Sequence, residues 1–120
     1  KSLEKLKELC QILEVEFEEV DSKKRLHYHL AASFANNFTN HILSLTDELV
    51  NKFKLEKKFF IPIANETFKK FQSNKSKESQ TGPAVRNDVK TLKKHEEILK
   101  KSNYLNLYKI ITKSIKKNDL

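Results

Sequence analysis

Short polar side chains recur within a stretch of the sequence that has no charge. Charged residues make up 33% of the chain, yet the 21 residues from Leu26 to Thr46 include no Asp, Glu, Lys or Arg. On an α-helix, with about 100° between successive residues, one line along the helix contains His29, Ser33, Asn36 and Asn40, with Asn37 beside it. Uncharged groups of this kind are typical of a ligand cleft or a subunit interface. The alternative is a polar seam that neighbouring helices of the same chain satisfy.

A second stretch, residues 80–88, contains Gly82, the single glycine of the chain. Thr81 and Gly82 lie where a helix is expected to start, and backbone N–H groups at such a start can bind an anion. The side chain of Arg86 can hold a carboxylate or phosphate with two parallel hydrogen bonds. These features predict an anion-binding turn. The alternative is structural: a Thr, Asn or Asp of this stretch caps the helix, and Arg86 pairs with a nearby acid.

Other kinds of reactive site are not indicated. The four histidines do not combine with a carboxylate or cysteine at a spacing typical of zinc, so no metal site is expected. No trio of Ser, His and acid is indicated, and catalytic residues are therefore not identified. The single cysteine, Cys10, cannot form an intrachain disulfide and suits a reducing cytoplasm.

The elements that must position these groups are predicted to be helical, with one exception. Apolar residues at helical spacing predict helices over 3–13, 57–72 and 89–99, and a further helix from Tyr104 to beyond Ile115. Val15, Phe17 and Val20 alternate with glutamates and predict a short strand over 15–20. Asp21 and Ser22 can cap a long helix that runs to Phe53 without Gly or Pro, about 45 Å in length.

The long helix is expected to contribute half of its circumference to a core. The residues on that half are Tyr28, Ala31, Ala32, Phe34, Ala35, Phe38, Ile42, Leu43, Leu45 and Leu49. A five-helix monomer with a radius of gyration of about 13–14 Å cannot cover such a helix along its whole length. We therefore expect a homodimer that forms through the long helix.

Composition excludes several other classes. A chain of 120 residues has room for one ordinary domain. The formal net charge is +8, but only two of the 24 cationic residues are Arg, which specific nucleic-acid contacts favour, so no nucleic-acid partner is expected. The many polar residues of the uncharged stretch make a membrane span unfavourable, so no membrane partner is expected either.

The two stretches together resemble a known family. The resemblance is carried by residues 27–37 (HYHLAASFANN) and 80–88 (QTGPAVRND), followed by Thr91 and His95, and it extends over about residues 21–115. The family is the helical C-terminal domain of unknown function that follows a Rossmann-like domain in candidate NAD(P)-dependent oxidoreductases. It is related to the C-terminal domains of pyrroline-5-carboxylate reductase and 6-phosphogluconate dehydrogenase. Asn87 departs from the family pattern, which more often has glycine there.

The resemblance implies an all-α bundle of about five helices around one long helix, similar to the C-terminal domain of 6-phosphogluconate dehydrogenase. Residues 1–20 would be a remnant of the end of a Rossmann-like domain, and residues 21–120 would be a helical dimerisation and substrate-side domain. The nucleotide-binding half would lie in cis outside this sequence. The fragment itself would then bind no cofactor and have no activity, whereas the parent protein would use NADP or NAD.

The resemblance also implies which residues contact a substrate near the nicotinamide. These substrate-binding candidates are His29, Ser33, Asn36, Asn37, Asn40, Thr81, Gly82 and Arg86, and the substrate would be a small anion. Two other interpretations stay open. The chain could be a basic helical module that binds nucleic acid, or a purely structural interaction domain whose polar line is satisfied internally.

Overall fold

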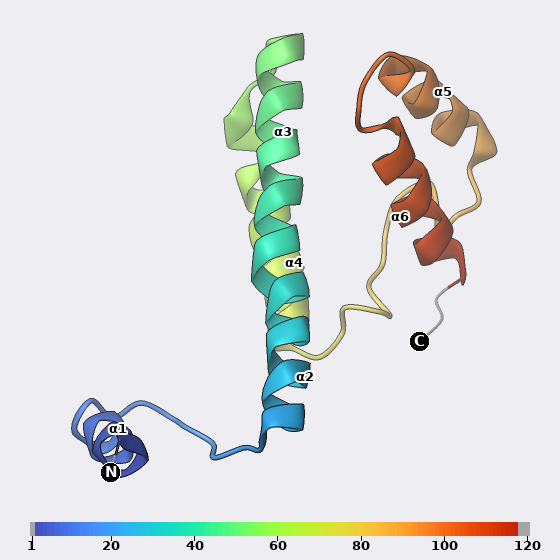
Figure 1. Cartoon of the computed structure of the whole chain (residues 1–120). Coiled ribbons are helices and arrows are strands. Elements are labelled where there is room, and N and C mark those ends of the chain that lie inside the picture. Colours follow the sequence, from blue (N-terminus) through green and yellow to red (C-terminus); the bar gives the residue numbers. More distant parts are fainter. Residues whose placement is uncertain (1, 118–120) are drawn as a thin grey trace. The chain divides into compact units, whose positions relative to one another are not determined.

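The computed structural model describes residues 2–117, and every regular element in that range is helical. The chain divides into two compact units, residues 1–57 and residues 58–120. Figure 1 shows the helices of both units. The predicted all-α class is confirmed.

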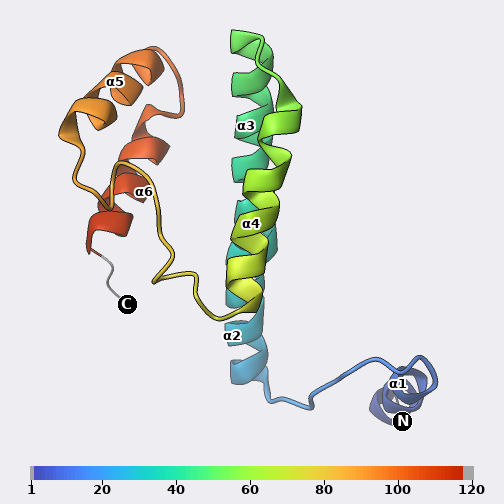
Figure 2. The same cartoon turned by 180° about the vertical axis from the view of Figure 1, so that it is seen from behind.

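The first unit contains a short helix and one long helix. Helix α1 (Ser2–Ile12) is followed by α2 (Ser22–Ala32), a π-helical turn η1 (Ser33–Phe38) and α3 (Thr39–Phe53). The last three elements form one uninterrupted helix over the predicted range, and both views show it as continuous (Figures 1 and 2). Its start is capped as expected: Asp21 Oδ1 accepts a hydrogen bond of 2.7 Å from the backbone N–H of Lys24.

The linker between α1 and α2 is not a strand. Residues 15–21 have neither helical structure nor a strand ladder, so the strand predicted over 15–20 is not formed in the described part of the chain. A strand needs a neighbouring strand to pair its backbone N–H and C=O groups, and none is described between residues 2 and 117. The linker is instead held by side chains, including an ion pair of 2.7 Å between Lys7 Nζ and Glu19 Oε2.

The second unit contains a 3₁₀ turn η2 (Lys57–Phe59, which begins at the last residue of the first unit) and three helices. These are α4 (Ile61–Gln72), which starts four residues later than predicted and has Pro62 in its first turn, α5 (Val89–Leu99) and α6 (Leu105–Lys117). Helices α5 and α6 lie side by side and are joined by a hydrogen bond of 2.8 Å between His95 Nδ1 and the hydroxyl of Tyr108. Ala84 and Leu92 are the buried apolar side chains of this unit among the described residues.

Three helix ends and one loop turn are closed by the same device. In each case one residue has a left-handed backbone, and the N–H of the next residue donates to the carbonyl five residues back at 2.9–3.0 Å. The left-handed residues are Glu14 (φ 51°), Lys54 (φ 54°), Asn74 (φ 56°) and Asn87 (φ 53°). Glycine favours this conformation, but the chain has only one glycine, so other residues adopt it at a cost.

The long helix exposes the side that the sequence assigns to a core. Phe34 is 63% exposed and Phe38 is 53% exposed, and their rings contact each other edge to face at 5.0 Å. Only Val50 is a buried hydrophobic side chain among the described residues of the first unit. The predicted core face is therefore largely exposed among the described residues. Between residues 2 and 117, no helix is long and apolar enough to cross a membrane.

Lys54→Gly is expected to raise the free energy of unfolding by about 1 kcal/mol, because glycine adopts a positive φ without the clash that costs other residues about 1–2 kcal/mol. Urea denaturation measures the change. The matched control is Lys52→Gly inside α3, which is expected to lower stability by about 1 kcal/mol. Equal destabilisation by both substitutions would contradict the assignment of strain to Lys54.

Candidate functional site

The predicted polar line falls across the π-helical turn. His29 lies in α2, Ser33, Asn36 and Asn37 lie in η1, and Asn40 lies in α3. A π turn bonds residue i to residue i+5, so it takes up one residue more than an α turn and rotates the remainder of the helix by about 100°. The five residues thus share a region of the helix but not the straight line that uniform α-geometry predicts. Such turns occur frequently at functional sites.

Two hydroxyl groups flank this turn and hydrogen-bond to the helix backbone. Ser33 Oγ donates to the carbonyl of His29 at 3.0 Å, four residues back. Thr39 Oγ1 donates to the carbonyl of Phe34 at 2.8 Å, five residues back, which is the spacing of the widened turn. Ser33 therefore donates its proton to the backbone and is left to accept hydrogen bonds from a ligand. Thr39 stabilises the carbonyl that the wide turn leaves accessible.

The remaining polar side chains of this region make no hydrogen bond with the described residues. His29, Asn36, Asn37 and Asn40 are exposed, and their side chains have no hydrogen-bond partner among residues 2–117. An internal polar seam is therefore not formed by the described chain. The groups are accessible to a ligand or to another polypeptide.

Residues 80–88 form a turn whose parts have structural roles. Gly82 has φ +104°, which requires glycine, and no atom lies within 4 Å of where its Cβ would be, so close approach is not the reason for it. The N–H of Asp88 donates to Pro83 and that of Asn87 to Ala84, at 2.9 and 3.2 Å. Asn87 takes the left-handed position, where asparagine is the usual substitute for glycine, so the departure from the family pattern leaves this turn intact.

Asp88 caps helix α5. Its Oδ1 accepts from the backbone N–H of Thr91 at 3.1 Å, and its Oδ2 accepts from the hydroxyl of Thr91 at 2.8 Å. These hydrogen bonds stabilise the carboxylate and hold the pKa of Asp88 below its ordinary value. A guanidinium nitrogen of Arg86 lies 4.0 Å from Asp88 Oδ2. Both parts of the structural alternative are thus present, because Asp88 caps the helix and Arg86 pairs with Asp88. Thr81 and Gly82 lie on the same short segment before the cap.

The candidates fall into two groups in separate units. His29, Ser33 and the three asparagines lie in the first unit, and the turn that carries Arg86 lies in the second. Each group is local to its own unit. Among residues 2–117 no group of three His, Cys, Asp or Glu side chains is placed to hold a metal ion.

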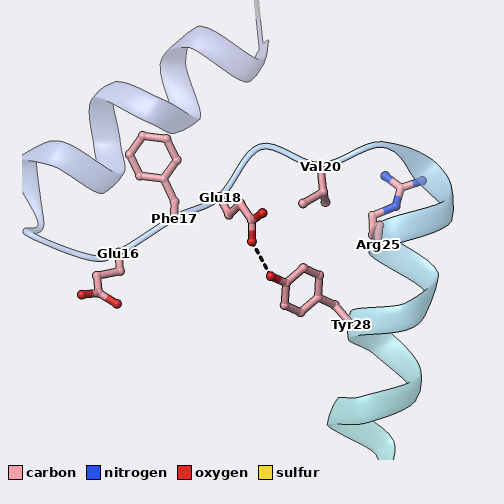
Figure 3. A pocket seen from close by; sticks show the side chains of 6 residues that line it. All are labelled: Glu16, Phe17, Glu18, Val20, Arg25 and Tyr28. Atoms are coloured by element: carbon pink, nitrogen blue, oxygen red, sulfur yellow. Dashed lines mark hydrogen bonds between the residues drawn. The ribbon is translucent and has the colours of Figure 1, made fainter.

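A cleft that the sequence does not reveal opens between the linker and the start of α2. It has a volume of about 470 Å³ and is open to solvent. The side chains that line it are those of Glu16, Phe17, Glu18, Val20, Arg25 and Tyr28 (Figure 3). Glu18 accepts hydrogen bonds from Lys24 Nζ through Oε1 and from the Tyr28 hydroxyl through Oε2. The linker is thereby fastened to the first turns of the long helix.

Those two hydrogen bonds shift the pKa values of the groups that form them. The hydrogen bond from Lys24 and then that from Tyr28 hold the pKa of Glu18 below its usual range. The same carboxylate raises the pKa of Lys24 and the pKa of Tyr28. Glu18 is therefore an anion and the Tyr28 phenol is protonated at neutral pH. The sequence hints at this arrangement only through the opposite charges of residues 16–19 and 23–25.

Known proteins offer two matches. The sequence profile of the family described as Domain of unknown function (DUF2520) matches residues 1–115. Among solved structures, the chain is similar to the crystal structure of a "putative NADP oxidoreductase" from Bacteroides fragilis, with a TM-score of 0.78 and 36% sequence identity. That similarity covers 83% of this chain and 39% of the other, so the chain spans well under half of that protein. No curated protein matches the sequence significantly.

Thr39→Val is expected to loosen the π turn, because the substitution removes a hydrogen bond while it keeps the shape of the side chain. Loss of about 1 kcal/mol predicts roughly fivefold faster amide exchange at residues 36–40, measured by hydrogen–deuterium exchange. The matched control is Thr46→Val, since Thr46 Oγ1 donates to Ile42 at 3.2 Å over an ordinary α-helical spacing. The role assigned to Thr39 is wrong if both variants leave exchange at residues 36–40 unchanged.

Proposed function

The chain belongs to the DUF2520 family, and from this we propose that it is the C-terminal dimerisation and substrate-side domain of an NADP-dependent oxidoreductase. The proposal rests on the exposed apolar face of the long helix. The same helix also carries exposed, uncharged polar side chains. The similarity over 83% of this chain to the Bacteroides fragilis protein supplies the class of reaction.

Dimerisation follows from the energetics of the apolar face. Phe34, Phe38, Ile42 and Leu49 are 39–63% exposed on one helix. Complete burial of a fully exposed side chain of this kind contributes about 1.5–3 kcal/mol, and burial of the exposed part of each contributes a fraction of that. A surface patch of this kind on a globular domain marks an interface. A second copy of the long helix provides a matching apolar face, and the isologous arrangement closes the assembly as a dimer.

Substrate contact follows from the kind of polar groups that stay free. Amide and imidazole side chains can donate and accept hydrogen bonds. They can therefore orient a reacting carbonyl or amine without forming an ion pair with it. We assign this role to His29, Ser33, Asn36, Asn37 and Asn40. Thr81, Gly82 and Arg86 are proposed as contacts for an anionic group of the substrate.

The cofactor would be bound elsewhere in the parent protein. We propose that residues 1–20 are the end of a Rossmann-like domain that binds NADP in cis, and that residues 21–120 supply the wall opposite the nicotinamide. This division agrees with the similarity to only 39% of the Bacteroides fragilis protein. The free thiol of Cys10 fits a cytoplasmic location.

Phe38→Asp is expected to weaken the dimer roughly 30-fold or more, because it places a charge in a central, desolvated part of the interface. Sedimentation equilibrium measures the dissociation constant, and circular dichroism checks that the helices remain. Phe59→Asp is the matched control, since Phe59 is similarly exposed but lies outside the long helix. A monomeric wild-type chain at high concentration, or equal weakening by both variants, would contradict the proposed interface.

The parent protein with its nucleotide-binding half is expected to bind NADPH, while the 120-residue chain alone does not. NADPH fluorescence titration measures both. In the parent protein, the double substitution Asn36→Ala and Asn40→Ala should leave NADPH affinity within about twofold and reduce turnover about tenfold or more, since each asparagine loses a substrate hydrogen bond. An unaltered turnover with reduced stability would favour the purely structural interpretation.

A further inference from the structure

We propose that the cleft between the linker and the start of α2 binds a small carboxylate that carries a planar apolar group, with Arg25 as its anchor. This site lies apart from the polar groups of the π turn and from residues 80–88. It depends on the geometry of residues 16–28 and not on the oxidoreductase assignment.

Charge is unevenly distributed in the cleft. Both oxygens of Glu18 are occupied, one by Lys24 and one by the hydroxyl of Tyr28. Among residues 2–117 the guanidinium of Arg25 has neither an ion pair nor a hydrogen bond, although it lines the same cleft. The carboxylate of Glu16 points away from Tyr28 and Arg25 in Figure 3. The cleft therefore presents an unneutralised guanidinium, which binds a carboxylate with two parallel hydrogen bonds.

Apolar side chains line the cleft next to that charge. Val20 and the ring of Tyr28 point into the space between the linker and α2, and the ring of Phe17, which also lines the cleft, projects from the linker toward α1 (Figure 3). A volume of about 470 Å³ lies within the range of roughly 300–1,000 Å³ that small-molecule sites occupy. In the proposed complex an aromatic ring lies beside Tyr28 and its carboxylate binds Arg25.

The walls of the cleft are fixed before a ligand arrives. The linker residue Glu18 accepts a hydrogen bond from the Tyr28 hydroxyl. Asp21 Oδ1 caps the first turn of α2 by accepting a hydrogen bond of 2.7 Å from the backbone N–H of Lys24. The linker is tied to α1 by an ion pair between Lys7 and Glu19. A preformed wall reduces the entropy that a ligand must offset on binding.

Arg25 is also the less neutralised of the two arginines in the chain. Arg86 already lies 4.0 Å from the carboxylate of Asp88, whereas Arg25 has no acid within ion-pair distance in the described part of the chain. An added carboxylate therefore gains more at Arg25 than at Arg86.

Benzoate is the probe that tests the site, with benzamide as its neutral counterpart and inorganic phosphate as an anion without a ring. The full chain contains only two arginines, so a ¹H–¹⁵N spectrum of ¹⁵N-labelled protein separates the side-chain Nε signals of Arg25 and Arg86. Benzoate is expected to shift the Arg25 signal saturably and the Tyr28 backbone amide with it. Benzamide and phosphate should shift them at least about tenfold more weakly at equal concentration.

Single-residue variants then distinguish benzoate binding by the Arg25 guanidinium from non-specific attraction to surface charge. Arg25→Gln is expected to weaken benzoate binding at least about tenfold, while Lys23→Gln, which removes a neighbouring cation on the same helix, changes it less than about twofold. Tyr28→Phe should weaken binding several-fold, since it releases Glu18 to compete for Arg25. Binding to these variants is measured at the backbone amide of position 28, so a folded helix is visible in the same spectrum.

Three outcomes overturn the proposal. If benzoate shifts the side-chain signal of neither arginine, the cleft does not bind a ligand of this class. Equal shifts of Arg25 and Arg86 indicate non-specific attraction to a basic chain. Loss of binding in Arg86→Gln but not in Arg25→Gln transfers the anion site to residues 80–88. None of these results alters the expected NADPH binding of the parent protein, so the two proposals can fail separately.

Discussion

The main constraint on this structure is the apolar surface of the long helix, which the described residues leave largely exposed. Burial of hydrophobic area is the main favourable term in folding, and a domain of this size normally hides about two thirds of the surface of its unfolded chain. Here Val50, Ala84 and Leu92 are the buried apolar side chains among the described residues, while aromatic rings along residues 22–53 stay exposed. Coverage of this face by another surface would stabilise the helix in water, and this is the basis of the proposed dimer. The uncharged polar groups lie on the same helix.

Two local contacts decide how that helix presents its side chains. The hydrogen bonds of Glu18 with Lys24 and Tyr28 fix the path by which the chain enters α2. The π turn, flanked by the hydroxyl of Thr39, rotates α3 relative to α2. The linker has no regular secondary structure, and the π turn replaces an α-helical turn. The π turn contains several of the uncharged polar residues that indicate a function, which is where departures from regular geometry are expected.

Much of the fold could be predicted, because the signals are local. The cap at Asp21, the uninterrupted helix to Phe53, and the position of Pro62 in the first turn of α4 follow from side-chain chemistry at single positions. The π turn could not be predicted, since no Gly or Pro marks it and a widened turn differs from an α turn by one backbone bond. The choice of substrate-contacting residues stays a prediction, and the π turn changes how those on the long helix are arranged. The sequence does not identify Arg25 as a binding residue, because its cleft is formed by the path of the linker. The helical pattern predicts that Tyr28 lies in a core, whereas Tyr28 is exposed in the structure.

The proposed dimer requires that the exposed face of the long helix is buried against a second copy of the same chain. Isotope-filtered nuclear Overhauser measurements on a mixture of labelled and unlabelled chains test this directly, because only contacts between copies give a signal. We predict intermolecular contacts from the rings of Phe34 and Phe38 to apolar side chains of the partner helix. A sample in which these rings contact only their own chain, at a concentration where any self-association is saturated, would contradict the dimer.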